Sequence, residues 1–207
     1  MPDFSLEIGY QNDNCRIIAG VDEVGRGALA GPIVAGAVVF EKYDEIITVL
    51  SELNDSKKLS ETKRVELDEL IKEKSKNYAF GVVSHEEIDQ FGIGAANIFA
   101  FKRALDRIPN IDLALIDGRR FRGFEYKYHC FEKGESKSLS IAAASIVAKV
   151  YRDGVMVEFG KKYPEYDFVS NKGYGSEKHF EVLESIGLSP IHRKSFLNCL
   201  EKPNKLF

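Results

Sequence analysis

Residues 17–40 read IIAGVDEVGRGALAGPIVAGAVVF, and this stretch indicates both a fold and a candidate site. It opens with residues 17–21, a short apolar run rich in β-branched side chains, which is typical of a buried strand. A second apolar run, residues 33–40, predicts the strand that returns beside the first. Asp22 and Glu23 stand where the first run ends. Because charged side chains are seldom buried without a partner, this pair requires a nearby cation, hydrogen bonds or a metal ion.

The turn between the two predicted strands contains residues suited to a ligand. Gly25 and Gly27 let the backbone approach a bound group, and Arg26 between them offers a planar donor fork suited to phosphate. Residues 25–30 also satisfy the G-x-G-x-x-G/A dinucleotide pattern, with Asp44 at roughly the spacing of a ribose-binding acid. That pattern requires the glycines to open a helix, whereas a β-branched run follows here, and the acidic pair would repel a pyrophosphate. We therefore favour a metal site over a nucleotide cofactor.

The composition is that of a globular protein. The chain has 207 residues, of which 44% are hydrophobic and 29% charged, and its formal net charge of -3 argues against a broad polyanion-binding surface while leaving room for a local basic groove. Three cysteines without a C-x-x-C pair fit a reduced protein of the cytoplasm. The polar, acidic residues 1–14 do not resemble a signal peptide, and the longest uncharged stretch, residues 27–40, is too short to span a membrane.

The rest of the chain alternates predicted helices and strands. Ser60 is suited to cap a helix whose apolar stripe includes Leu67 and Ile71. The last fifty residues are more helical and irregular, so we expect a main core over residues 1–155 and a C-terminal helical region over residues 156–207, packed on the same domain. The other predicted elements are a short helix within 41–53, strands at 77–84, 111–116 and 125–131, a helix from about Gly94 to Pro109, and an alanine-rich helix over 138–150.

A second acid follows a predicted strand. Asp117 ends the apolar run 111–116 as Asp22 ends the first run, and in open α/β sheets ligands gather at the carboxyl ends of strands. If the two strands are neighbours, the acids meet, and crowded carboxylates cost stability unless a divalent cation lies between them. Oxygen ligands favour Mg²⁺ or Mn²⁺. Glu23 should point to the opposite face from Asp22, so it reaches the same site only if the strand bends or its side chain curls round the strand end.

Five blocks of the sequence, in order along nearly the whole chain, resemble the ribonuclease HII family, the type 2 ribonucleases H. A chance match of all five is implausible, although any one of them alone would be only suggestive. The blocks are residues 21–32 (VDEVGRGALAGP), 55–59 (DSKKL), 116–118 (IDG), 140–153 (SIAAASIVAKVYRD) and 171–176 (NKGYGS).

The resemblance implies an α/β ribonuclease H-like fold with a five-stranded mixed sheet flanked by helices, and a helical extension at the C-terminus. It implies endonucleolytic cleavage of RNA in RNA-DNA hybrids, and 5′ of single ribonucleotides embedded in duplex DNA, giving 5′-phosphate and 3′-hydroxyl ends with two Mg²⁺ or Mn²⁺ ions. Asp22, Glu23 and Asp117 would be three of four catalytic, metal-binding carboxylates. The fourth is usually an aspartate but is Glu135 here, and the added methylene would shift the second metal or change the metal preference. The alternative is a hybrid-duplex binding protein whose catalysis is weakened by Glu135.

The resemblance also implies how the substrate is bound. The backbone of residues 25–27 would contact the 2′-hydroxyl that marks a ribonucleotide. Tyr174 would lie beside that hydroxyl, with its ring against the neighbouring deoxyribose, and Lys57 and Lys58 would contact phosphates, which makes binding salt-dependent. We expect the four histidines to be structural, with His179 near the Tyr174 loop as the first exception to consider. We expect a monomer with no evident protein partner, although Leu206-Phe207 leaves a clamp-binding peptide open.

Overall fold

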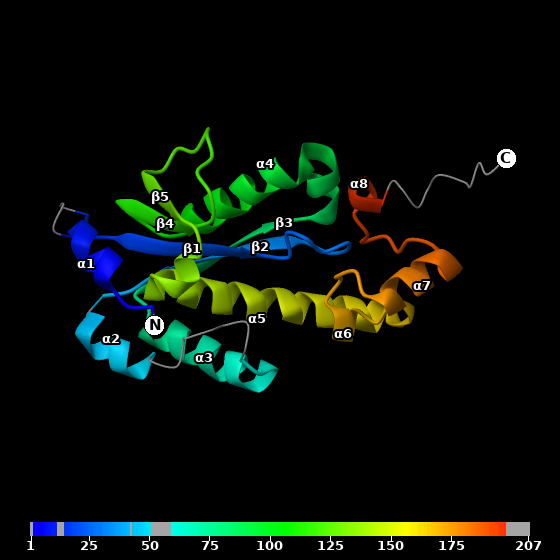
Figure 1. Cartoon of the computed structure of the whole chain (residues 1–207), viewed down its shortest axis with the longest axis horizontal. Coiled ribbons are helices and arrows are strands. Elements are labelled where there is room, and N and C mark those ends of the chain that lie inside the picture. Colours follow the sequence, from blue (N-terminus) through cyan, green and yellow to red (C-terminus); the bar gives the residue numbers. More distant parts are fainter. Residues whose placement is uncertain (1, 12–14, 42, 51–58, 198–207) are drawn as a thin grey trace.

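The structure is a computed structural model that describes residues 2–11, 15–41, 43–50 and 59–197 (Figure 1). Its centre is the expected mixed sheet of five strands, and their order is β3-β2-β1-β4-β5. β1 pairs antiparallel with β2 and parallel with β4, β2 pairs antiparallel with β3, and β4 pairs parallel with β5. The strands are β1 (Ile18–Val24), β2 (Ile33–Val39), β3 (Asn77–Val83), β4 (Leu113–Asp117) and β5 (Tyr128–Phe131).

Helices cover both faces of the sheet. α4 (His85–Leu105) lies on one face, against β2 and β3, and α5 (Leu139–Lys162) lies on the other, against β1 and β2 (Figure 1). α3 (Glu61–Lys74) packs on the outer side of α5. Short helices complete the described chain: α1 (Ser5–Gln11), α2 (Tyr43–Val49), α6 (Phe168–Asn171), α7 (Glu177–Ile186) and α8 (Lys194–Leu197).

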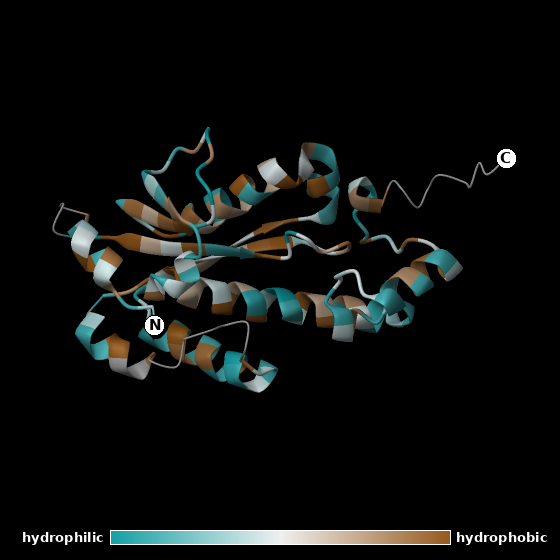
Figure 2. Ribbon diagram, viewed as in Figure 1, coloured by the Kyte–Doolittle hydropathy of each residue, from teal (hydrophilic) through white to brown (hydrophobic). Residues whose placement is uncertain are grey.

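The β1–β2 hairpin is buried on both faces because helices cover it from either side. All seven residues of β2 are buried, which explains why its sequence is continuously apolar rather than alternating. Figure 2 shows hydrophobic residues along these central strands. Gly20 and Gly36 face α5, where an added Cβ would lie 2.1 Å from the Ser140 carbonyl carbon and 2.5 Å from the Ala144 oxygen. The two glycines therefore allow α5 to pack with its backbone close to the sheet.

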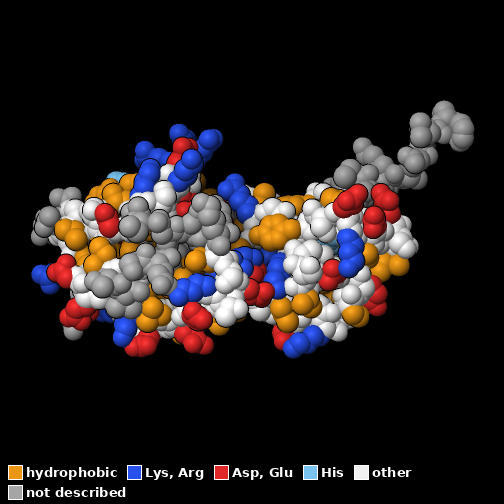
Figure 3. Space-filling view, turned by 60° about the horizontal axis from the view of Figure 1, so that its bottom comes forward, with side chains coloured by type: hydrophobic (Ala, Val, Ile, Leu, Met, Phe, Trp, Pro, Cys, Tyr) orange, Lys and Arg blue, Asp and Glu red, His pale blue; other side chains and the backbone are white. Residues whose placement is uncertain are grey.

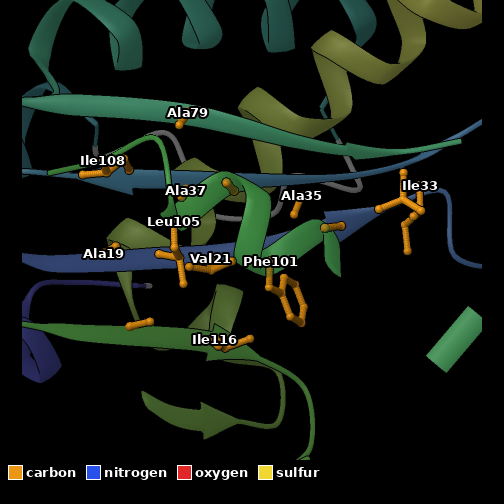
Figure 4. Close-up of a cluster of buried hydrophobic side chains, with 14 of the residues drawn as sticks. Ala19, Val21, Ile33, Ala35, Ala37, Ala79, Phe101, Leu105, Ile108 and Ile116 are labelled. Atoms are coloured by element: carbon orange, nitrogen blue, oxygen red, sulfur yellow. The ribbon is translucent and has the colours of Figure 1, made fainter. Parts of the chain in front are cut away.

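Two main hydrophobic clusters hold these layers together. The first lies between the sheet and α4, and includes Val21, Ile33, Phe101 and Ile116 (Figure 4). The second lies between α5 and the α2–α3 layer. Each cluster buries several large aliphatic and aromatic side chains, and each such burial contributes about 1.5–3 kcal/mol to stability. This packing holds the strand ends in place around the candidate site.

Three element boundaries differ from expectation. α4 begins at His85, because Ser84 and Glu87 form a capping box, and a kink at Gly92 (φ 78°) separates this first part from the helix expected from about Gly94. α5 continues to Lys162 instead of ending near residue 150. β5 begins only at Tyr128, since Phe121 and neighbouring aromatic residues pack against the α4-side cluster as a loop. None of the helices in the described ranges is both long and apolar enough to cross a membrane.

Candidate active site

The parallel pairing of β1 with β4 sets the geometry of the site. Their register aligns Val21 with Ile116, so the next residue of each strand, Asp22 or Asp117, lies at the same edge of the sheet. The two strands are neighbours, which is the condition under which the two acids were expected to meet. The edge is the one where ligands collect in α/β folds.

Asp22 points into the layer between the sheet and α5. Its side chain is buried, with the residue 5% exposed, and its Oδ1 accepts a hydrogen bond from the Glu23 backbone N–H at 2.8 Å. A side-chain hydrogen bond joins it to Ser145 of α5. Burial, together with the nearby negative charges of Glu23 and Asp117, raises the pKa of Asp22 well above its ordinary value.

Glu23 turns toward the other layer. Its carboxylate makes a side-chain hydrogen bond with Asn97 of α4, and one oxygen lies 3.6 Å from Nη1 of Arg26. Burial raises the pKa of Glu23, Arg26 acts in the opposite direction, and Asp117 adds to the rise. The two neighbouring acids thus do face opposite layers, as the alternation of an extended strand predicts. Both acids nevertheless line the same cavity, because they lie at the end of β1.

Asp117 and Glu135 are linked through a tight turn. The Gly134 backbone N–H donates to Asp117 Oδ1 at 2.6 Å, and Glu135 follows in the 3₁₀ turn Gly134–Ser136 just before α5. A Cβ at position 134 would lie 2.8 Å from Ile141 Cδ1 and 3.3 Å from Asp117 Oδ1, so this turn lies close to the end of β4 and a larger residue would require Ile141 to shift. The turn brings the half-buried Glu135 to the edge that holds Asp22 and Asp117.

A cavity of about 590 Å³ collects these residues. Its lining includes all four predicted acids, together with the glycines of the β1–β2 turn, Arg26 and Tyr174, and it also includes three residues that the sequence did not single out. Lys57 and Lys58 lie outside the described residues. The lining comprises Asp22, Glu23, Val24, Gly25, Arg26, Gly27, Arg64, Asp117, Glu135, Ser145, Lys149 and Tyr174.

The cavity can supply oxygen ligands to a metal ion. In the described ranges, however, no three His, Cys, Asp or Glu side chains already form a group able to hold an ion. The acids line a shared space rather than a closed ligand shell. Carboxylate oxygens are the donors that Mg²⁺ and Mn²⁺ prefer, so the chemistry of the lining fits these ions.

Arg64, Ser145 and Lys149 are cavity residues that the sequence analysis missed. Arg64 belongs to a basic cluster on α3, and such clusters are solvated faces by default. Ser145 and Lys149 are one helical turn apart on α5, and Arg152 follows one turn later. Polar residues at this spacing on an otherwise apolar helix form a stripe, and the stripe could have marked the side of α5 that faces the acids.

Basic side chains also lie outside the cavity. The connection between β4 and β5 projects from the molecule, and Figure 3 shows Lys and Arg side chains gathered on this projection. They include Arg119 and Arg120, which line a second cavity of about 400 Å³ beside β5. Arg119 is highly exposed and pairs with Glu132 at 2.9 Å. A salt bridge this exposed contributes little to stability.

The Tyr174 turn is held by two buried histidines. The Ser189 backbone N–H donates to His192 Nδ1 at 2.9 Å, which leaves the proton of that ring on Nε2, 3.0 Å from His179 Nε2. His179 Nδ1 then donates to the Tyr174 carbonyl at 2.8 Å. Burial and the neighbouring His179 lower the pKa of His192 to about 4, so this imidazole is neutral near pH 7. His192 is thus buried within the fold, and His179, the exception considered above, contacts the backbone of the Tyr174 turn.

The β1–β2 turn does not have the geometry of a dinucleotide site. Residues 25–30 connect two antiparallel strands and open no helix, so the G-x-G-x-x-A match lacks its required context. Gly25 has a φ of 87°, and a Cβ there would meet the Arg152 guanidinium at 2.1 Å. Gly25 therefore allows the Arg152 side chain to approach the backbone of the turn.

Comparison with known proteins decides the family. Residues 19–199 match the family model described as Ribonuclease HII. The chain belongs to the ribonuclease HII family. It is accordingly an endonuclease of the hydrolase class, acting on RNA in RNA-DNA hybrids, in a family that depends on divalent metal ions.

Individual relatives agree with this assignment. The ribonuclease HII of Clostridioides difficile (strain 630) is 51% identical over 181 residues, which covers 87% of this chain and 69% of that protein. The ribonuclease HII of Endomicrobium trichonymphae is 45% identical over 195 residues, covering 93% of this chain and 91% of that protein. Among solved structures, the PCNA:RNase HII complex from Archaeoglobus fulgidus is similar with a TM-score of 0.74 and 27% identity, covering 86% of this chain and 94% of that one.

Proposed function

We propose that this enzyme cleaves both hybrid duplexes and duplex DNA at the 5′ side of a single embedded ribonucleotide, giving 5′-phosphate and 3′-hydroxyl ends. The observation that carries the proposal is the convergence of four acids on one cavity. Asp22 and Glu23 end β1, Asp117 ends β4, and Glu135 precedes α5. A cavity lined by four carboxylates, with basic residues beside them, suits hydrolysis of a phosphodiester without a protein nucleophile.

The four acids would hold two Mg²⁺ or Mn²⁺ ions. Such ions supply an activated water and stabilise the leaving 3′ oxygen of an in-line displacement. Ser145 and the Glu23 N–H orient the Asp22 carboxylate, Asn97 orients Glu23, and the Gly134 N–H orients Asp117. These three acids are thus held in place by hydrogen bonds before substrate arrives, which limits the reorganisation needed during the reaction.

Sugar recognition is assigned to the two turns at the cavity mouth. The backbone of residues 25–27 can approach a ribose closely because Gly25 and Gly27 carry no side chains, and only a 2′-hydroxyl distinguishes RNA from DNA at one nucleotide. Tyr174, 37% exposed, offers its ring to the neighbouring deoxyribose. Arg64 and Lys149 supply positive charge in the same cavity, where they would contact phosphates and make binding salt-dependent.

The proposal is tested with a duplex that carries one ribonucleotide, incubated with Mg²⁺ or Mn²⁺. We expect the wild type to incise it on the 5′ side of that ribonucleotide. Asp22→Asn and Asp117→Asn should each lower the rate by about 10³-fold or more, since each removes an oxygen ligand and a charge from the site, with duplex binding nearly unchanged. Asp112→Asn is the matched control, because Asp112 is an exposed aspartate that only accepts backbone N–H groups of Arg16 and Ile17.

Full activity of Asp22→Asn or Asp117→Asn would refute the site, and an intact strand with the wild type would refute the proposed reaction.

Glu135→Asp extends the same assay to the fourth acid. Its shorter side chain restores the aspartate usual in the family, so we expect the ratio of Mg²⁺-supported to Mn²⁺-supported rates to rise, since Mg²⁺ tolerates poor geometry less well. An unchanged ratio would show that the added methylene does not affect metal use.

A further inference from the structure

The two turns assigned to sugar recognition are bonded to each other, although they are far apart in the sequence. The first turn comprises residues 25–32 and the second residues 171–175. The backbone N–H groups of Leu29 and Ala30 both donate to the Gly173 carbonyl, at 2.8 and 3.2 Å. A Cβ at Gly173 would lie 2.6 Å from the Ala30 oxygen, so the two backbones are as close as glycine permits.

Arg152 ties the first turn to the second. Its side chain is fully buried, and it donates from Nε to the Pro32 carbonyl at 2.9 Å and from Nη2 to the Ala30 carbonyl at 3.2 Å. The remaining nitrogen, Nη1, donates to the Lys172 carbonyl of the second turn at 3.0 Å. The guanidinium carbon lies 5.2 Å from the centre of the Tyr174 ring, within the range of a cation–π contact.

Arg193 holds the first turn from the C-terminal region. It too is fully buried, and it donates from Nε to the Gly31 carbonyl at 3.0 Å and from Nη1 to the Arg26 carbonyl at 3.1 Å. Its Nη2 is buried without a hydrogen-bond partner among the described residues. Burial, and the neighbouring positive charge of Arg152, lower the pKa of Arg193 below the usual value for a guanidinium.

Neither guanidinium forms an ion pair with any carboxylate of the described ranges. Two buried, unpaired cations side by side are costly, and packing alone would be achieved more cheaply by neutral side chains. What a guanidinium adds is a rigid planar set of donors that reaches several carbonyls at fixed spacing, which neither a lysine nor an apolar residue provides. The pair is therefore suited to setting the relative position of two backbone segments.

We infer that Arg152 and Arg193 are positioning residues that fix the turn at 25–32 against the Tyr174 turn, and so set the spacing between the groups that read a ribose and its neighbouring sugar. This role rests on the proposed function. The spacing matters most where one nucleotide alone carries a 2′-hydroxyl, because the two turns must then engage adjacent sugars in a single register. A continuous RNA strand presents a 2′-hydroxyl at every position and tolerates a looser fit.

The test compares Arg193→Lys and Arg152→Lys with the wild type on two substrates, a single-ribonucleotide duplex and a uniform RNA-DNA hybrid. We expect kcat on the single-ribonucleotide duplex to fall about 10-fold or more relative to kcat on the hybrid, with KM within about 3-fold, because a lysine keeps the charge but cannot bridge two carbonyls. Arg107→Lys is the matched control. Arg107 also donates to a backbone carbonyl, that of Phe80, but it lies in the exposed segment after α4, and its substitution should leave the ratio unchanged.

If kcat falls equally on both substrates, the two arginines have a merely structural role. If kcat changes on neither substrate, the inference is likewise overturned. Hydrogen exchange of the wild type gives a second readout if the variants do not fold. The Leu29 and Ala30 amides should exchange as slowly as those of β1, whereas fast local exchange would show that the turns are not locked together. Failure of the wild type to cleave either substrate would instead refute the proposed function.

Discussion

Asp22 shows how a single residue couples stability to the proposed chemistry. Its carboxyl is buried at the end of β1, and its pKa is raised by that burial and by Glu23 and Asp117. A raised folded-state pKa means that the folded protein binds this proton more tightly than the unfolded chain does. The resulting stabilisation is complete below the unfolded-state pKa, about 3.9, and is lost as pH rises through the higher folded-state value. In the metal-free protein the buried Asp22 carboxyl therefore contributes less stability at neutral pH than it does at low pH.

Replacing Asp22 with asparagine should stabilise the fold while removing activity. In EDTA at pH 7 we expect the Tm of Asp22→Asn to exceed that of the wild type by about 2–4 °C, the shift that about 1 kcal/mol produces in a chain of this size. Adding Mg²⁺ or Mn²⁺ should raise the wild-type Tm more than that of the variant, because the cation offsets carboxylate repulsion only where the carboxylates are present. Differential scanning calorimetry measures both effects.

Asp89→Asn is the control with the opposite expected sign. Burial acts to raise the pKa of Asp89, but hydrogen bonds from Ser195 and Lys194 lower it overall, so its charge stabilises the fold at neutral pH. Its Tm should fall, with the metal response unchanged. A lower Tm for Asp22→Asn in EDTA would contradict the assigned cost of the buried charge.

The acids could be predicted from the sequence, whereas the residues that support them could not. An acid directly after an apolar strand is visible in the order of residues, and the family blocks add Glu135. Arg193 lies in a short basic pair that is indistinguishable from a solvated one, and only packing shows that it is buried against the β1–β2 turn. The burial of a long cationic side chain depends on contacts between distant segments, and local sequence does not encode those.

At the scale of elements, the site depends on how closely α5 lies on the sheet. α5 carries Ser145 and Lys149 toward the acids, and its first turns meet β1 at Gly20, where a Cβ would fall within 2.1 Å of backbone. Because backbone cannot move aside as a flexible side chain can, any side chain at Gly20 must push the helix away from the strand. The positions of Ser145 and Lys149 in the cavity lining follow from this contact.

Gly20→Ala should therefore destabilise the protein by about 3 kcal/mol, near the upper end of the usual cost of overpacking, and should lower the cleavage rate of the folded fraction. Gly94→Ala is the matched control, since Gly94 lies in α4 with no atom within 4 Å of an added Cβ. Alanine there should stabilise the protein by about 0.5–1 kcal/mol through its better helix propensity. Urea denaturation followed by circular dichroism measures both, and equal effects of the two substitutions would contradict the close-packing argument.

Most elements were predictable because their periodicity is local. The strands of the β1–β2 hairpin, β3 and β4 each match an apolar run of the sequence, and α3 begins after the expected Ser60 cap. The predicted helix starts near Gly94 because the acidic residues 85–87 carry no apolar stripe, although Ser84 and Glu87 have the spacing of a capping box. The start of β5 was wrong because aromatic residues alternate there as in a strand but are used to cover the α4-side cluster.

The whole molecule is organised around interactions between the N-terminal hairpin and the C-terminal region. α5 runs continuously from the sheet to Lys162, and the third hydrophobic cluster joins Ala30 of the β1–β2 turn with Phe168, Leu183 and Ile191. Arg193, which holds the first recognition turn, comes from this same region. We therefore expect residues 156–207 to form one folding unit with residues 1–155 and not a separable module.

Unfolding of the full chain should accordingly be a single transition. Far-UV circular dichroism reports the helices, and near-UV circular dichroism reports tyrosines such as Tyr43 in the second cluster and Tyr166 in the third. The two urea curves should therefore coincide if all parts unfold together. A chain ending at residue 163 keeps all of α5 but exposes Ala30 and Met156, and should lose several kcal/mol because the buried partners of these residues are gone. It should also fail to incise a single-ribonucleotide duplex, since it lacks Tyr174. Two separate transitions, or an unchanged Cm for the shortened chain, would show that the C-terminal region folds independently and that the site does not depend on it.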